Sequence, residues 1–491
     1  MALSFLQELL ICTIVLVVPL FLIIIKSTSK RNSLLPTEWP IVGMVPALIA
    51  NRNNFHEFAT GMLAASGHNF MVRGPPGCTS MRFFTTCDPA NVQHIFTTNF
   101  DNYPKGEELA EVFGVLAGTI IAADGESWRR QRARIQFVLT RPELLAFLAR
   151  SCRDKVANGL VPMLTRMAST GAPFDMEDLL GRLIFDLTVM VVFGTASCCL
   201  SPDMPPMDVA SALDAIMEVT VYRHSVPTLC WKLVRWLNLG WERKYAEAEA
   251  LLRRFAGEKI DSRRMAGDAS GEDAPGDMLS QYINDPEFLD DEGEPTDFLH
   301  RTFINFMVAL RDPMSSALPW LVYNLATHPE ALSAMRDELA PIAARKTDAN
   351  GSGGAVIFES EETKDLVYQR AALFESLRLY PIGPLERKAV VADDVLPSGH
   401  RVRGGDTIMV SFYTIGRLEG VWGADCREYR PGRSCLGKKI AIAHLTSIVA
   451  TLLWNFDVEV QENHAVEPKL SVILQMKNGF MVKVTKRQDI K

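Results

Sequence analysis

The hydrophobic pattern of the chain begins with one long apolar run near the N-terminus. Leu9 to Ile25 carries no charge and is about long enough to span a bilayer as a helix. Glu8 precedes the run, whereas positive charges follow it at Lys26, Lys30 and Arg31. This asymmetry predicts a retained single-pass anchor rather than a cleaved signal peptide, and it places the rest of the chain in the cytosol.

Amphipathic stretches typical of helices dominate the chain after this run. We expect helices at Pro142–Met167, Met176–Phe193, Trp241–Met265, Thr296–Thr327 and Leu366–Leu379, and surface loops at Gly267–Pro295 and Ala349–Gly354. Strand patterns come late: one strand at Val402–Phe412, and a hairpin of Ser471–Met476 with Phe480–Val484 around Asn478-Gly479. The fold class predicted is mainly α with small β-sheets (α+β).

No second-domain boundary or internal repeat interrupts the 491 residues. We therefore expect an anchor with its basic flank at 1–33, a stiff proline-rich spacer at 34–47, and one domain at 48–491. The net charge of -7 argues against nucleic-acid binding, which normally needs a basic face. Nine scattered cysteines show neither disulfide nor zinc-site spacing.

The most informative motif surrounds Cys435 in the octapeptide from Gly432 to Lys439. Arg433 lies two residues before this cysteine and Gly437 two residues after it, where an apolar helix begins. A helix N-terminus and nearby cations favour the ionised thiolate, which suits a ligand of iron. Gly437 would allow close approach of backbone to a flat cofactor. Alternatively, Cys435 is one more small buried hydrophobic residue.

Two further pairs of polar residues lie on single helix faces. Glu375 and Arg378 are three residues apart among apolar neighbours, so they can pair and be at least partly buried. Trp128 and Arg132 lie one helical turn apart, and a ring N–H beside a cation suits a carboxylate such as a propionate. The alternatives are a solvated surface pair and a basic amphipathic helix, respectively.

In this order along the chain, these segments resemble a cytochrome P450, a haem-thiolate monooxygenase. Three segments are similar to plant fatty-acid omega-hydroxylases and mid-chain alkane hydroxylases: Asn102–Gly106, Ala123–Trp128 and Leu396–Gly399. The resemblance implies the P450 fold, haem b with Cys435 as its axial ligand, a long-chain aliphatic substrate, and electrons from NADPH-cytochrome P450 reductase at the endoplasmic reticulum membrane.

The resemblance also implies roles for other residues. Trp128, Arg132 and Arg433 would hold haem propionates, Gly437 would lie against the haem, and Glu375 with Arg378 would support the haem-binding region. Ala309 and Asp312, in the long helix Thr296–Thr327, would border the site of oxygen chemistry.

The chain departs from the family pattern at two places. In the long helix, Leu310 stands for a glycine and Pro313 for a threonine, so a hydroxyl that would steer protons to dioxygen is missing. Pro313 and Pro319 each remove a helix hydrogen bond, so we expect a kink. Before Cys435, the family has a Phe-x-Pro-x-Arg element and then a couple of dozen further residues.

The family's cysteine motif, Phe-x-x-Gly-x-Arg-x-Cys-x-Gly, then follows; in this chain Glu428 takes the place of its phenylalanine and Pro431 that of its first glycine. No arginine is left to complete the network of Glu375 and Arg378. This indicates an internal deletion, from a missed exon or a decayed gene. Three functions follow: a monooxygenase of aliphatic chains, a haem-thiolate isomerase or peroxide user, or a non-catalytic membrane-anchored relative.

Overall fold

The computed structural model describes residues 35–75, 81–265, 276–283, 295–350, 354–431 and 439–487. The helices are α2 (Val45–Ala50), α3 (Phe55–Ala65), α4 (Pro89–Gln93), α5 (Glu107–Phe113), α6 (Gly125–Leu139), α7 (Pro142–Lys155), α8 (Val161–Thr170), α9 (Met176–Phe193), α10 (Asp208–Ser225), α11 (Thr228–Trp236), α12 (Gly240–Met265), α13 (Met278–Ile283), α15 (Pro295–Thr327), α16 (Pro329–Asn350), α17 (Ser360–Thr363), α18 (Val367–Leu379), α19 (Phe412–Ile415), α20 (Glu419–Trp422) and α21 (Lys439–Asn455). The strands are β1 (Asn69–Arg73), β2 (Arg82–Thr86), β3 (Phe174–Asp175), β4 (Leu385–Ala389), β5 (Asp394–Val395), β6 (Arg401–Val402), β7 (Thr407–Ser411), β8 (Phe456–Val460) and β9 (Met481–Lys486). The fold is therefore mainly helical with small sheets, as predicted.

Helices lie close to where the apolar pattern placed them. Helix α9 has the predicted bounds because Asp175 caps its first turn and Gly194, with a φ of 68°, ends it in a left-handed conformation. Helices α12, α15 and α18 each differ from the prediction by one residue at the start. The segment 142–170 is α7, one π-helical turn and α8 in direct succession. Helix α15 stays one element through both internal prolines.

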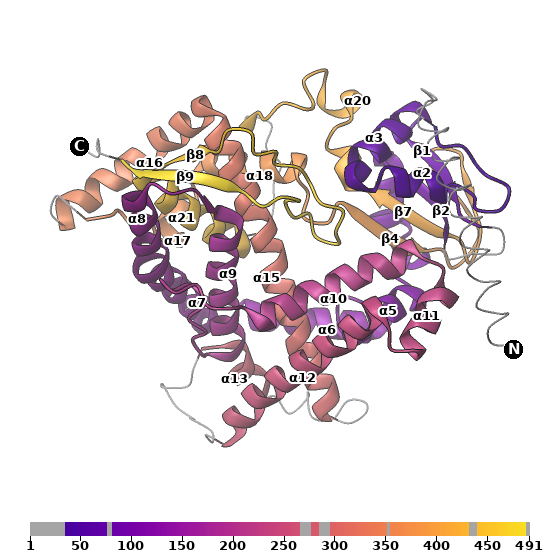
Figure 1. Ribbon diagram of the computed structural model, residues 1–491, viewed down its shortest axis with the longest axis horizontal. Coiled ribbons are helices and arrows are strands. Elements are labelled where there is room, and N and C mark those ends of the chain that lie inside the picture. Colours follow the sequence, from indigo (N-terminus) through magenta and orange to yellow (C-terminus); the bar gives the residue numbers. More distant parts are fainter. Residues whose placement is uncertain are drawn as a thin grey trace, which may run out of the picture.

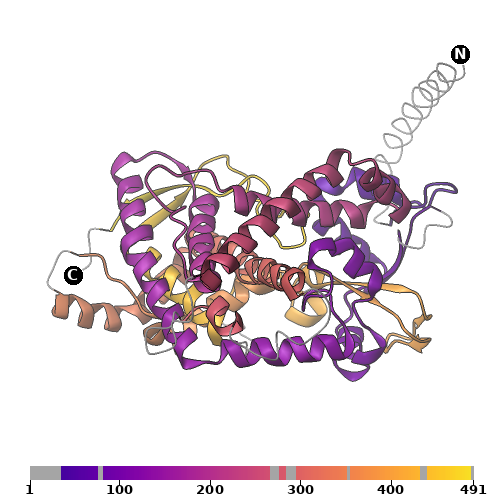
Figure 2. The same cartoon turned by 90° about the horizontal axis from the view of Figure 1, so that it is seen from below.

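The larger sheet has the strand order β1-β2-β7-β4, with β2 and β7 parallel and the other pairs antiparallel. With α2 and α3 it forms one end of the molecule; α8, α16, β8 and β9 lie at the opposite end, with α15 between the two ends (Figure 1). The view from below shows the same separation (Figure 2). The predicted strand at Val402–Phe412 is wrong: a turn at residues 403–406 divides it into β6 and β7, and Phe412 begins α19.

The predicted hairpin is also wrong in its first arm. Strand β9 pairs with β8 and with β3, in the order β3-β9-β8. Residues 471–476 form no strand, and Met476 makes only an isolated bridge to Pro468. Asp175 accepts the Phe480 N–H at 2.9 Å, so the chain after Asn478-Gly479 is held by β3. Likewise, the predicted loop Gly267–Pro295 contains α13 and the first residue of α15.

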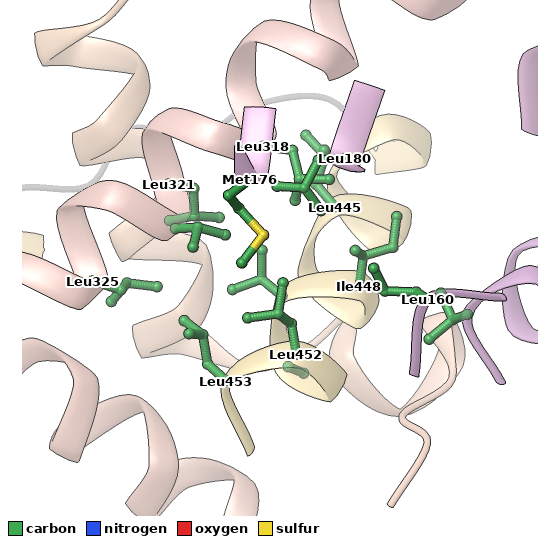
Figure 3. Close-up of a cluster of buried hydrophobic side chains, with 14 of the residues drawn as sticks. Leu160, Met176, Leu180, Leu318, Leu321, Leu325, Leu445, Ile448, Leu452 and Leu453 are labelled. Atoms are coloured by element: carbon green, nitrogen blue, oxygen red, sulfur yellow. The ribbon is translucent and has the colours of Figure 1, made fainter. Parts of the chain in front are cut away.

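The principal apolar core lies where four helical segments meet (Figure 3). Its side chains come from the π-helical turn, α9, α15 and α21, and those labelled in the figure are Leu160, Met176, Leu180, Leu318, Leu321, Leu325, Leu445, Ile448, Leu452 and Leu453. This packing fixes α15 against α21, the helix that begins four residues after Cys435. The elements bearing the candidate site are therefore held by the core.

Among the described helices, none is long and apolar enough to cross a membrane. Residues 1–34, which include the predicted anchor Leu9–Ile25, lie outside the described part of the chain. The anchor therefore stays a prediction.

Candidate active site

Glu375 and Arg378 form a buried ion pair on α18. Their side chains are 3% and 5% exposed, and two guanidinium nitrogens each bond one carboxylate oxygen at 2.8 Å. The Arg430 backbone N–H donates to the same carboxylate at 2.8 Å. The remaining donors of Arg378 bond the carbonyls of Gly416, Cys426 and Glu428. The prediction that this pair lies on one helix face is confirmed.

The inference that the pair lacks a third partner needs correction. Backbone groups of residues 416–430 satisfy both side chains, so no third arginine is required to occupy their hydrogen-bonding groups. The Arg430 side chain contributes nothing to the pair, because its guanidinium is 56% exposed and bonds Glu428 and Asp425.

The structure also disfavours the alignment of Glu428 with the phenylalanine of the family's cysteine motif. Glu428 has a side chain 58% exposed, which is unsuitable for the place of a phenylalanine. Tyr429 is buried, and its hydroxyl donates to the Ala372 carbonyl of α18 at 2.8 Å. Aligning Tyr429 and Pro431 with the aromatic residue and the proline of the Phe-x-Pro-x-Arg element instead puts an aromatic ring in the core, where large apolar side chains are most often found.

Helix α6 presents Trp128 and Arg132 together, as predicted. The guanidinium of Arg132 lies 5.2 Å from the centre of the Trp128 ring, within the range of a cation–π contact. Phe100 packs against the same indole at 5.7 Å between ring centres. Trp128 is half-buried and Arg132 is exposed, so both polar groups remain available to a ligand.

Two lysines that the sequence did not single out as site residues converge on this place. Lys105 Nζ lies 5.9 Å from the Trp128 ring centre, and Lys388 Nζ lies 5.9 Å from that of Phe100. Burial lowers the pKa of Lys105 to about 8; the charges of Lys388 and Arg132 act in the same direction, and those of Asp124 and Glu386 in the opposite one. Lys388 is only 4% exposed. Its Nζ lies 3.6 Å from Oε1 of Glu386, which is too far for a hydrogen bond. This excess of buried positive charge suits an anionic ligand.

On α15, Asp312 pairs with the neighbouring Arg311 at 3.0 Å. Arg311 also bonds both carboxylate oxygens of Asp214, on α10, at 2.7 and 3.2 Å. Burial raises the pKa of Asp312 to about 6, although the Arg311 charge acts in the opposite direction. The Arg311 Nε–H is buried and has no partner among the described residues.

The other residues of this stretch differ in their surroundings. Ala309 is exposed although Val308 and Arg311 are buried, so there is open space beside the helix at this position. Leu310 packs against the apolar cluster between α9, α10 and α12. Pro313 cannot donate to the Ala309 carbonyl, and the nearby Ser315 hydroxyl is buried without a partner in the described structure.

A cavity of about 280 Å³ opens beside Asp312. Its walls come from α10, the start of α12, α15 and the chain segment 469–475. Half of the lining residues are apolar or aromatic, including Met217, Val221, Tyr222, Trp241 and Ile473. Its volume is near the lower end of the range of ligand sites, and its apolar walls suit an aliphatic or aromatic group.

The predicted iron ligand Cys435 and its neighbours Arg433 and Gly437 lie at 432–438, outside the described residues. Their assignments stay predictions. Within the part of the chain that the structure describes, no group of three or more His, Cys, Asp or Glu side chains could hold a metal ion.

Comparison with known proteins identifies the family. The sequence model described as Cytochrome P450 matches residues 34–433. The chain belongs to the cytochrome P450 family. It is 34% identical to noroxomaritidine synthase 1 of Narcissus pseudonarcissus over 505 residues, and this alignment covers 98% of the present chain and 96% of the relative. It is 33% identical to cytochrome P450 86B1 of Arabidopsis thaliana (98% and 91% covered) and 30% identical to alkane hydroxylase MAH1 of the same plant (91% and 93%).

Cytochrome P450 86B1 and alkane hydroxylase MAH1 agree with the branch that the sequence indicated. The alignment with noroxomaritidine synthase 1 is longer than the 491 residues of this chain, so that relative has residues that this chain lacks. The family match ends at Arg433, two residues before Cys435. The first observation agrees with a deletion somewhere in the chain, and the second agrees with a break in the family pattern just before Cys435.

Family membership makes the protein a monooxygenase with a haem whose iron is held by a thiolate, and it implies a reductase as redox partner. The described residues fit this cofactor in two ways. Lys105, Arg132 and Lys388 supply positive charge for its propionates, and Trp128 supplies a ring N–H. The exposed Ala309 gives room beside α15 for a large flat group.

Proposed function

We propose that this P450 hydroxylates long aliphatic chains, of fatty-acid or alkane type, with dioxygen and electrons from NADPH-cytochrome P450 reductase. The observation that supports this proposal is the cavity beside Asp312, where apolar and aromatic side chains make up half of the lining residues and offer an aliphatic chain surface to pack against. Alkane hydroxylase MAH1 is among the relatives.

Each candidate residue has a distinct task in this proposal. Cys435 would supply the thiolate that holds the iron, and the haem-thiolate unit, when bound, would supply the dioxygen chemistry for hydroxylating an unactivated C–H bond. Trp128, Arg132, Lys105 and Lys388 bind the propionates, with Arg433 and Gly437 assigned to the cofactor by sequence alone. Glu375 and Arg378 hold the segment 416–430 against α18. Asp312 borders the substrate and can hold a proton near neutral pH, because its pKa is raised to about 6.

The ligand assignment is tested by a carbon monoxide difference spectrum of the reduced protein and of Cys435→Ser. We expect the absorbance of the thiolate-carbonyl complex in the parent chain and its loss in the variant. An unchanged spectrum in Cys435→Ser would overturn the assignment. Products from hexadecane and hexadecanoic acid, supplied with the reductase and NADPH, then test the substrate class.

Reaction with peroxide is a second candidate activity, supported by Leu310 and Pro313. With proline at this position, no threonine hydroxyl at 313 can donate a proton toward dioxygen. If hydroxylated product forms with hydrogen peroxide but not with NADPH and reductase, the peroxide-dependent activity replaces the reductase-dependent one as the proposed function. If neither condition gives product and haem is absent, the chain is the non-catalytic relative.

The proposed location is the endoplasmic reticulum membrane, with residues 1–33 as the anchor and the domain in the cytosol. The charge asymmetry around Leu9–Ile25 supports it. Protease added to intact microsomes should digest the domain, whereas complete protection would place it in the lumen.

A further inference from the structure

The three segments that indicated the branch, Asn102–Gly106, Ala123–Trp128 and Leu396–Gly399, meet in the fold although they are far apart in the sequence. The third is the turn between β5 and β6. One carboxylate from the second segment and one from the hairpin of β5 and β6 each bond the first segment. The chain that carries Lys105 is therefore held between two carboxylates.

Asp124, from the second segment, bonds the backbone at Lys105 itself. Its two oxygens accept the Lys105 N–H at 2.9 Å and the Gly106 N–H at 2.7 Å. Gly106 has a φ of 86°, and a Cβ there would lie 2.8 Å from the Cβ of Ala389, which is closer than two such carbons approach. The Lys105 backbone is thus fixed by hydrogen bonds from one direction and by close packing from another.

Asp394, the first residue of β5, holds the chain just before Lys105. Its Oδ2 accepts hydrogen bonds from the Tyr103 hydroxyl at 2.7 Å, from His94 Nε2 at 2.8 Å and from Asn99 Nδ2 at 2.8 Å. Burial acts to raise the pKa of the Asp394 carboxyl, but these bonds lower it below its usual range. Tyr103 is fully buried, so the residue two positions before Lys105 has its ring in the core and its hydroxyl on a carboxylate.

The Lys105 side chain is fixed by the same surroundings. Its ammonium donates to the carbonyls of Ile120 at 2.7 Å and Ala123 at 3.2 Å. An ammonium group has three donors, so one donor remains for a ligand. Ala123 directly precedes Asp124, so one short stretch of chain holds both the backbone and the head group of this lysine.

We propose that Asp124 and Asp394 are positioning residues for the haem, which hold Lys105 so that its remaining donor binds a propionate beside Trp128. This inference rests on the proposed function, which assigns Lys105 to the propionates, and adds the residues that fix it there. A free lysine side chain loses conformational entropy when a ligand orders it. A lysine that is already held loses less, so it binds the same propionate more tightly.

The test measures haem loss, so that it does not depend on turnover. The full chain in detergent is loaded with haem or with haem dimethyl ester, whose propionates carry no charge, and transfer of the cofactor to excess apomyoglobin is timed. Asp124→Asn replaces one acceptor oxygen by an amide group, and Tyr103→Phe removes the hydroxyl that bonds Asp394. We expect haem loss to be about tenfold faster in Asp124→Asn and about threefold faster in Tyr103→Phe. Loss of the ester should change less than twofold in either variant.

Tyr413→Phe is the matched control. Tyr413 is also buried, at 2% exposed, and its hydroxyl donates to a carboxylate, Glu57, at 2.9 Å, but it bonds none of the three segments. This variant should change neither rate.

Lys105→Gln decides whether the two positioning residues act through the lysine. It should itself lose haem about tenfold faster, and in its presence neither Asp124→Asn nor Tyr103→Phe should add more than about twofold. Equal acceleration of haem and ester loss, full additivity with Lys105→Gln, or a parent chain that holds no haem would overturn the inference. The expected haem-loss rates in a chain that oxidises neither hexadecane nor hexadecanoic acid would instead contradict the proposed function alone.

Discussion

Two buried arginines, Arg378 on α18 and Arg311 on α15, differ in how completely their guanidinium groups are hydrogen-bonded. All three guanidinium nitrogens of Arg378 have partners, namely both oxygens of Glu375 and three carbonyls. Arg311 serves two carboxylates and leaves its Nε–H buried without a partner in the described structure.

A fully satisfied polar network fixes one conformation, whereas an incompletely satisfied one stores unmet hydrogen-bonding capacity. The Arg378 network bonds the backbone of residues 416–430 to α18, and its role is structural. The Arg311 network borders the cavity and holds a carboxyl with a raised pKa. The comparison thus distinguishes two regions of the P450 domain. The region around Arg378 stabilises the fold, and the region around Arg311 can take part in catalysis.

Removing one partner of the satisfied network should have the largest effect. Glu375→Ala leaves the Arg378 charge buried without its counter-ion, which we expect to lower the free energy of unfolding by about 3–5 kcal/mol. Urea denaturation followed by circular dichroism measures it. Glu247→Ala, which removes an exposed partner of Arg243 on α12, is the control and should cost under about 0.5 kcal/mol. A cost below 1 kcal/mol for Glu375→Ala would show that this network is not structural.

The Arg311 network should instead make the free energy of unfolding depend on pH. The pKa of Asp312 is raised in the fold, so its protonated form is the stabilising one, and that contribution is lost as pH rises from about 4 to about 6. The parent should therefore lose up to about 3 kcal/mol relative to Asp312→Asn across this window. Above pH 6.5 the difference between the two proteins should be constant, which serves as the internal control. A difference that does not vary between pH 4 and 6 would remove Asp312 as a titrating group.

A smaller effect is expected where α15 lacks a hydroxyl. Leu310→Gly with Pro313→Thr supplies a donor beside Ala309 and restores an N–H to the helix, so product formed per NADPH consumed should rise by about threefold, under 1 kcal/mol. Pro319→Thr, the other proline of the same helix, is the control and should leave this yield unchanged. Equal yields in all three proteins would show that the Leu310 and Pro313 stretch is not the limitation.

The sequence predicted features that depend on local spacing and missed those that depend on pairing over long distances. The bounds of α9 followed from its apolar pattern and its caps, and the Glu375–Arg378 pair followed from a separation of three residues. The partner of β9 could not be read in the same way, because β8 and β3 lie elsewhere in the chain. Asp214 and Lys388 were missed for the same reason, since only the fold brings them to Arg311 and Lys105. The division of Val402–Phe412 had a local signal in Gly404-Gly405-Asp406 that an apolar strand pattern concealed.

The smallest effect should come from Arg430, whose side chain lies at the edge of the Arg378 network without joining it. Its backbone N–H bonds Glu375, but its guanidinium is 56% exposed and bonds only Glu428 and Asp425. Arg430→Gln keeps the backbone bond and loses only exposed ion pairs, so its free energy of unfolding should be indistinguishable from that of the parent protein. Glu428→Gln, measured alongside, should cost equally little, because Glu428 is not the buried residue of the family element. A clear loss of stability in Arg430→Gln, comparable with that of Glu375→Ala, would mean that the Arg430 guanidinium is a third member of the network, and the distinction between the two arginines would then rest on Arg311 alone.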